Sequence, residues 1–272
     1  MFNRKSLYLF LLSLTVCSIL FTGLFPYVFG LSLLIVVFMN RGIAYTLIAN
    51  KALTEKKIDK GYKYLTKAYK TNGVPHIVVN GYIYISMKLG FFDVAEEAID
   101  RVLSGKIHYK LKDGQKNMIL TQKGILEWCK GDIKKGLEIL ESLYVNSYRT
   151  SVFYGNYGCL LYLDGQYKKA EEISLEGYDF GSTDKVTLDN LVAVYIALNE
   201  LDSAEKYLNE ILDLAPTFAE AWFHAATFEF IHGNIQKAEE HLDKARKYEL
   251  SKISSISVED LDNLEYKIKA AK

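Results

Sequence analysis

The sequence predicts an all-α protein, a solenoid of about six stacked helix–turn–helix units between a hydrophobic helical hairpin and a final helix. Three observations predict this fold. The chain has 3 prolines in 272 residues, which favours helices over turn-rich sheets. Residues 7–39 contain no charged residue. A small residue recurs at a nearly constant interval, at Gly61, Ala95, Gly136, Ala170, Ala204 and Ala238.

The uncharged stretch of residues 7–39 comes first. As one straight helix it would measure about 50 Å, whereas the apolar core of a bilayer is about 30 Å thick. Gly23, Pro26 and Gly30 interrupt it. We therefore expect two short arms, residues 6–22 and 27–39, forming a transmembrane hairpin that anchors residues 1–40. The pattern leaves open whether each arm crosses the bilayer fully, and whether the second arm continues unbroken into residues 40–53.

Basic residues flank the apolar stretch on both sides. Arg4 and Lys5 precede it, and Arg41, Lys51, Lys56 and Lys57 follow it. Because positive residues favour the cytoplasmic side, we expect a multi-pass protein of the cell membrane with everything after Asn40 in the cytoplasm. A cleaved signal sequence ending at Cys17 is the alternative. Val16 stands where such a site needs a small residue, and the apolar run continues beyond it.

The repeat follows in residues 41–250. Counted backwards from Ala238, the intervals between the small residues are 34, 34, 34, 41 and 34 residues. An apolar residue stands three positions before each of them, and five positions before stands a glycine, except for Asn199 and Lys56. Glycine and asparagine tolerate the left-handed backbone that ends a helix. Each unit is therefore predicted to be a helix A, a tight turn and a helix B.

The residue types have a packing reason. A small side chain lets helix A and helix B approach closely, and a larger one would overpack the contact at a cost of about 1–3 kcal/mol. A single unit cannot bury its apolar face alone, so the units must stack.

The period and the pattern resemble the tetratricopeptide repeat (TPR) family. The resemblance is strongest in the last two units and covers about residues 42–250, while the first two units match mainly in register. The matching positions in the last two units are Leu188, Leu191, Tyr195, Ala204, Leu208, Pro216, Trp222, Ala225, Ala226, Gly233, Ala238, Leu242 and Ala245. The resemblance implies a right-handed superhelical solenoid.

Three features depart from the regular pattern. Ser174 and Gly177 stand where the family has other residues, so a short or loosely packed helix B is expected there. The 41-residue interval carries extra residues near 104–114, including Lys106, Lys110 and Lys112, read as a solvated loop, as two added helical turns, or as a contact with anionic lipid. Residues 251–272 are predicted to form a capping helix with Ser257 as its N-cap.

The composition and the lack of motifs argue against nucleic-acid binding, metal binding and catalysis. Equal numbers of basic and acidic residues, 33 of each, give no reason to expect nucleic acid. No phosphate-binding, hydrolase or zinc motif occurs. Two histidines and two glutamates, His232, Glu239, Glu240 and His241, gather near one turn, but their helical positions point apart. We therefore expect no metal, no cofactor and no enzymatic activity.

The family resemblance implies a concave surface lined by the A helices, where members of the family hold a partner's peptide or helix. Mapping the groove positions gives eight candidate binding residues: Asn80, Tyr84, Met87, Trp128, Tyr162, Asp189, Phe223 and Phe230. Thr121, Ile125, Cys159, Ala193 and Thr227 complete the lining. This aromatic and apolar surface suits an amphipathic helix or an apolar peptide. The alternative is that Trp128, Tyr162 and Phe230 are core residues between the repeats.

The predicted function is therefore that of a membrane-anchored scaffold or adaptor that binds a protein partner through its concave face. The alternative is a structural subunit of a larger membrane complex, or a self-assembling scaffold, with no free peptide groove. The many lysines, isoleucines and tyrosines are typical of an AT-rich bacterial genome.

Overall fold

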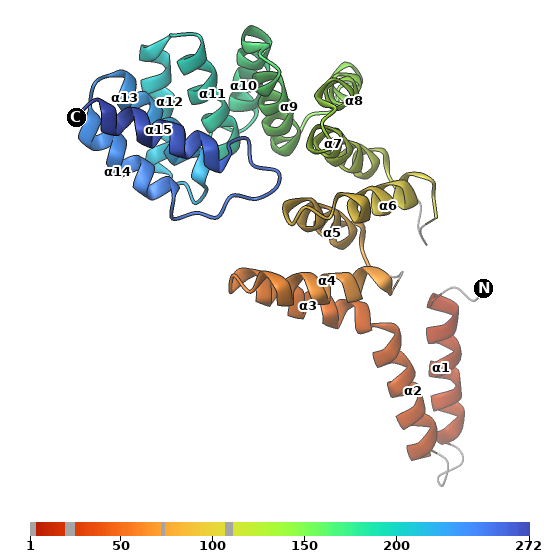
Figure 1. The fold of residues 1–272 in the computed structure, drawn as a ribbon. Coiled ribbons are helices and arrows are strands. Elements are labelled where there is room, and N and C mark those ends of the chain that lie inside the picture. The colour runs from red at the N-terminus through yellow and green to blue at the C-terminus, as the bar shows by residue number, and fades with distance from the viewer. Residues whose placement is uncertain (1–3, 20–24, 72–73, 107–110) are drawn as a thin grey trace. The chain divides into compact units, whose positions relative to one another are not determined.

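The computed structural model describes residues 4–19, 25–71, 74–106 and 111–272, and in these residues all regular secondary structure is helical (Figure 1). The chain divides into two compact units, residues 1–82 and 83–272. The boundary falls inside one helix, α5 (His76–Lys88). The expected all-α architecture is therefore confirmed.

The first unit holds two helix pairs. Helix α1 packs against α2, and α3 packs against α4. The helices are α1 (Arg4–Ile19), α2 (Phe25–Met39), α3 (Arg41–Thr54) and α4 (Ile58–Lys70). Helix α2 ends at Met39 and α3 starts at Arg41, so the second arm does not run on unbroken as one helix. The expected turn at Gly23 lies outside the described residues.

The helices of the expected anchor are short. Taken singly, none of the described helices has the length and apolarity needed to cross a bilayer. The segments Pro26–Met39 and Arg41–Thr54, bent by 50° with respect to each other, meet the same criterion when they are taken together.

The second unit is an array of helix pairs followed by one more helix. Its helices are α6 (Phe92–Leu103), α7 (Asp113–Cys129), α8 (Ile133–Val145), α9 (Ser151–Leu163), α10 (Tyr167–Phe180), α11 (Lys185–Ala197), α12 (Leu201–Asp213), α13 (Ala219–Ile231), α14 (Ile235–Ala245) and α15 (Val258–Ala270). Helices α7, α9, α11 and α13 contact one another in succession, and each also packs against the helix that follows it. We call the surface formed by these four A helices the concave face.

The six turns between helices A and B share one backbone conformation. Lys56, Gly90, Gly131, Gly165, Asn199 and Gly233 all have positive φ, between 57° and 95°. In each turn the amide of the following residue bonds the carbonyl four positions earlier than the turn residue, as from Asn234 to Glu229 at 2.9 Å. This is the Schellman closure of a helix. Every helix B then starts two residues after the turn residue, so the predicted register is confirmed in all six units.

Lys56 is the least suitable of these turn residues, because its Cβ is strained at φ 57°. We expect Lys56→Gly to raise the free energy of unfolding by about 0.5–1 kcal/mol. The midpoint of thermal unfolding measures this. Asn199→Gly is the matched control, and its free energy of unfolding should rise less, since asparagine tolerates the left-handed region. A lower midpoint for Lys56→Gly than for the wild type would contradict the strain argument.

The departures from the pattern are accommodated by packing. Helix α10 has 14 residues, so the expected shortening of this helix B is wrong. A Cβ on Gly158 would lie 2.6 Å from the Ser174 hydroxyl, and one on Gly177 would lie 2.8 Å from the Tyr154 Cβ. Small residues thus face larger ones, and the expected loose packing is wrong as well.

A longer helix takes up part of the long interval. Helix α7 has 17 residues, whereas α9 has 13, so one helical turn is added at its start. Lys110 lies outside the described residues. At the C-terminus, Ser257 caps α15 as expected, and Asp260 completes a capping box. The helix spans Val258–Ala270, which is shorter than the expected residues 251–272.

Candidate functional site on the concave face

The segment between α14 and α15, residues 250–257, crosses the concave face instead of turning directly back, and we call it the strap. Its Lys252 amide donates to the Lys88 carbonyl at 3.0 Å, and the Cys129 thiol lies 3.9 Å from the Lys252 carbonyl. The Ser254 hydroxyl donates to the Glu220 carboxylate of α13. Figure 1 shows the strap as a blue loop. It therefore joins the last repeat to residues of the second.

Three apolar residues of the strap, spaced by three positions, attach it to the repeats. Ile253 packs against the core that α7, α8, α9 and α10 form together. Ile256 is buried in a core shared by α13, α14 and α15, and Leu250 packs against the same core. The intervening residues are serines and one lysine. The concave face therefore accepts a non-helical segment with apolar side chains at every third position.

The strap packs against the same apolar cores as four of the predicted groove residues. Trp128 and Tyr162 border the same core as Ile253, while Phe223 and Phe230 border the same core as Ile256. All four aromatic side chains are half-buried. Part of this aromatic lining therefore packs on the same cores as the chain's own segment.

The remaining predicted residues lie in different surroundings. Met87 and Asp189 are buried, so they do not line an open surface. Tyr84 is exposed. Asn80 is half-buried and belongs to the first unit, whereas the other predicted groove residues belong to the second.

Asp189 instead forms a buried pair that the sequence argument missed. Its Oδ1 lies 2.7 Å from the His224 Nδ1, and both residues are buried. Burial alone would lower the pKa of His224, but the charge of Asp189 and the hydrogen bond to it outweigh burial and raise that pKa above its usual value. The ring of Tyr162 stands edge-on to that of His224, 6.3 Å away. The pair thus links α9, α11 and α13 beneath the groove.

Cys159 lies near this pair, which invites a comparison with a thiol nucleophile. Burial raises the pKa of the Cys159 thiol to about 12, and the Asp189 and Glu220 carboxylates add to the effect. A nucleophilic cysteine requires the opposite shift, because the thiolate is the reactive form. The proximity of the three side chains therefore does not create an activated thiol.

The two histidines near the turn of the last repeat, His232 and His241, have different neighbours. His232 bonds the Phe228 carbonyl at 3.1 Å, whereas His241 stacks edge-on against Trp222. In the described part of the chain, no group of three or more His, Cys, Asp or Glu residues could hold a metal ion.

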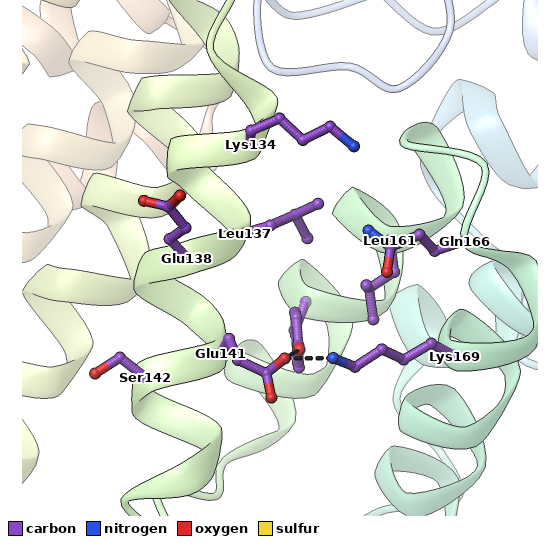
Figure 2. Close-up of a pocket in the computed structure, with 9 residues that line it drawn as sticks. Lys134, Leu137, Glu138, Glu141, Ser142, Leu161, Gln166 and Lys169 are labelled. Atoms are coloured by element: carbon purple, nitrogen blue, oxygen red, sulfur yellow. Dashed lines mark hydrogen bonds and ion pairs between the residues drawn. The ribbon is translucent and has the colours of Figure 1, made fainter.

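A second candidate is a cavity of about 500 Å³ between α8, α9 and α10 (Figure 2). Glu141 accepts hydrogen bonds there from Lys169 and Tyr157, and these bonds hold the pKa of the Glu141 carboxyl below its usual value. Figure 2 shows Lys134 and Glu138 at its rim. Because its central charges already satisfy one another, the concave face is the stronger candidate.

Comparison with known proteins agrees with this geometry. The sequence matches no protein-family model, and no curated protein matches it either. Its fold is similar to that of a tetratricopeptide repeat protein from Parabacteroides merdae, at 12% identity and a TM-score of 0.62, covering 96% of this chain and 98% of that one. A thermophilic TPR protein of Thermus thermophilus gives a TM-score of 0.56 at 18% identity, covering 70% and 99%.

A third similar structure is a chain of the APC/C hetero-tetramer Cut9–Hcn1, with 17% identity and a TM-score of 0.64. The match covers 83% of this chain and 42% of that longer one. These likenesses establish a TPR-like solenoid fold.

Proposed function

We propose that this chain is a membrane-anchored scaffold whose concave face binds an apolar segment of a partner protein. The observation that carries the proposal is the strap, because a surface that holds one segment of this chemistry can hold another. A suitable partner segment would place apolar side chains three residues apart, like Leu250, Ile253 and Ile256. We assign the protein no catalytic role.

The partner must compete with the strap. A tethered segment has a high effective concentration, in the millimolar range for short flexible linkers, so a free peptide of equal affinity occupies the groove rarely. A protein with a similar fold does assemble with another protein, in the Cut9–Hcn1 hetero-tetramer. This supports a protein partner that offers a larger surface than the strap alone.

The first two helices support the membrane anchor. Leu9 in α1 and Leu34 and Phe38 in α2 expose 66%, 68% and 63% of their surface. Large contiguous apolar surfaces on a protein mark contacts with lipid or with another protein. Charged residues flank these helices on both sides. We therefore propose a multi-pass protein of the cell membrane with its repeats in the cytoplasm.

The groove proposal is tested by loosening the strap. We expect Ile253→Ser combined with Ile256→Ser to free the groove, so that a labelled synthetic peptide of residues 248–258 binds this variant at least tenfold more tightly than it binds the wild type. Fluorescence anisotropy measures the binding. Adding Trp128→Ala and Phe230→Ala should abolish it, and a peptide of scrambled sequence is the control.

Two outcomes would count against a free groove. If the peptide binds neither chain, the structural-subunit alternative is favoured, with the strap as a permanent part of the fold. If the strap variant binds the scrambled peptide equally well, the surface binds peptides without sequence specificity. If the peptide results support the groove, a crosslink from residue 230 to a protein in intact cells would identify the partner.

A further inference from the structure

The neutral net charge of the chain conceals a strong asymmetry. Residues 1–82 contain ten basic and two acidic residues, whereas residues 83–272 contain 23 basic and 31 acidic residues. The two units therefore carry charges of opposite sign and similar size. An asymmetry of this kind indicates a contact with a membrane or a nucleic acid at the basic part.

Four of the ten basic residues of the first unit lie on α4. Lys60, Lys63, Lys67 and Lys70 are all exposed, and their spacing places them on one face of the helix. The opposite face is buried, at Gly61, Leu65 and Ala68. We call the four lysines the α4 stripe. Among the described residues, ring contacts of the stripe come from Lys67, whose ammonium lies 5.0 Å from the Tyr64 ring centre and 5.7 Å from that of Tyr45.

The α4 stripe lacks the partners that lysines have elsewhere. Across the described residues, no carboxylate lies within ion-pair distance of any of the four ammonium groups, and Glu55 is taken by Lys57 and Lys51. In the second unit, by contrast, lysines pair across neighbouring repeats, as Lys130 does with Glu96 and Lys168 with Glu200. Four lysines in one row, without an ion pair to any described carboxylate, favour an anionic partner outside the chain.

The helix that packs on α4 favours lipid as this partner. Helix α3 exposes Ile43, Leu47 and Ile48, which also share a helix face. At the bend between α2 and α3, the Arg41 guanidinium stacks on the Phe38 ring at 3.7 Å. Exposed apolar side chains and clustered lysines within one short segment are typical of a chain that meets a membrane surface.

We propose that the α4 stripe binds anionic lipid headgroups at the surface of the membrane that holds the anchor. This inference rests on the proposed membrane anchor. Lysines suit the role because each is a mobile point charge that needs no fixed partner geometry. Clusters of four to eight basic residues next to a membrane helix bind anionic lipids through the surface potential.

The test uses the full chain reconstituted in two kinds of vesicle, one of phosphatidylcholine and one with a third of phosphatidylglycerol. We expect amine labelling, followed by mass spectrometry, to be about tenfold slower at the α4 stripe in anionic vesicles than in neutral ones. The protection should disappear at about 0.5 M salt, where charges on a surface are screened. Lys247, exposed in the second unit, should react equally in both.

Variants separate the stripe from the anchor. Replacing the four lysines by glutamine should abolish the preference for anionic vesicles, at about fivefold in surface affinity per lysine. Glutamine at four other exposed lysines, Lys116, Lys244, Lys247 and Lys267, should leave the preference intact. Vesicle flotation in neutral lipid reports the anchor alone, so its failure would contradict the anchor and not the stripe.

Two results would overturn the inference. One is equal labelling of the α4 stripe in neutral and anionic vesicles, which would mean that no headgroup contact exists. The other is protection by a single-stranded DNA oligonucleotide without protection by anionic vesicles, which would assign the stripe to nucleic acid.

Discussion

Replacing His224 by leucine is expected to lower the free energy of unfolding by about 3–5 kcal/mol at pH 6. The variant leaves the buried Asp189 carboxylate without the partner that lies 2.7 Å away in the wild type. A buried charge without compensation is far more costly than the loss of one exposed contact. Thermal unfolding of the two proteins under the same conditions measures the difference.

The pH dependence follows from the direction of the shift. The pKa of His224 is raised in the folded protein, so the charged histidine contributes its full stability below about pH 6.5, the ordinary histidine pKa. This contribution is lost as the pH rises through the raised, folded-state pKa. We therefore expect the gap between the wild type and His224→Leu to narrow on going from pH 6 into the alkaline range.

A double variant separates the pair from simple packing. Combining His224→Leu with Asp189→Ala removes both charges, and we expect it to recover at least half of the lost stability, because apolar replacement of a whole buried pair is often nearly neutral. If the double variant is as unstable as His224→Leu alone, the loss reflects shape and not the unpaired carboxylate.

The turns of this fold were predictable because each depends on local residues. The six left-handed positions follow from glycine, asparagine and a constant register, and even Lys56 adopts the conformation that its register requires. The strap was not predictable, since its serine-rich sequence has no helical or strand period. Its position depends on Lys88 and Cys129, which lie more than a hundred residues away in the chain.

The candidate site illustrates the same division between local and tertiary information. Family register correctly places Tyr162 and Phe230 on A helices, but register cannot tell an open position from a covered one. Asp189 was assigned to the groove from its register alone. Its hydrogen-bond partner, His224, lies on the following A helix. The two residues are 35 positions apart, one more than the 34-residue period, so the motif alignment gave no reason to pair them.

Gly136→Ala is expected to lower the free energy of unfolding by about 1–3 kcal/mol, although helix propensity alone favours the reverse. Alanine favours helices over glycine by about 1 kcal/mol, and Ala95, Ala170, Ala204 and Ala238 occupy the same position in other units. In the structure, however, a Cβ on Gly136 would lie 2.5 Å from the Gly124 backbone carbonyl oxygen. A backbone atom cannot rotate away, so α7 and α8 would have to separate.

The third unit differs from the others because both the small residue and the residue that faces it are glycine. Twelve positions before the small residue stands Gly124 here, whereas Ala226 precedes Ala238 by the same interval. Two glycines thus permit a close approach of the α7 and α8 backbones. The surrounding side chains are packed to match, since a Cβ on Gly136 would also lie 3.1 Å from the Leu160 Cδ2. Gly114→Ala is the matched control, since a Cβ there meets nothing within 4 Å, and it should raise the thermal midpoint. A rise of similar size for Gly136→Ala would mean that the two helices can separate at no cost, and the close backbone contact would then not stabilise the repeat.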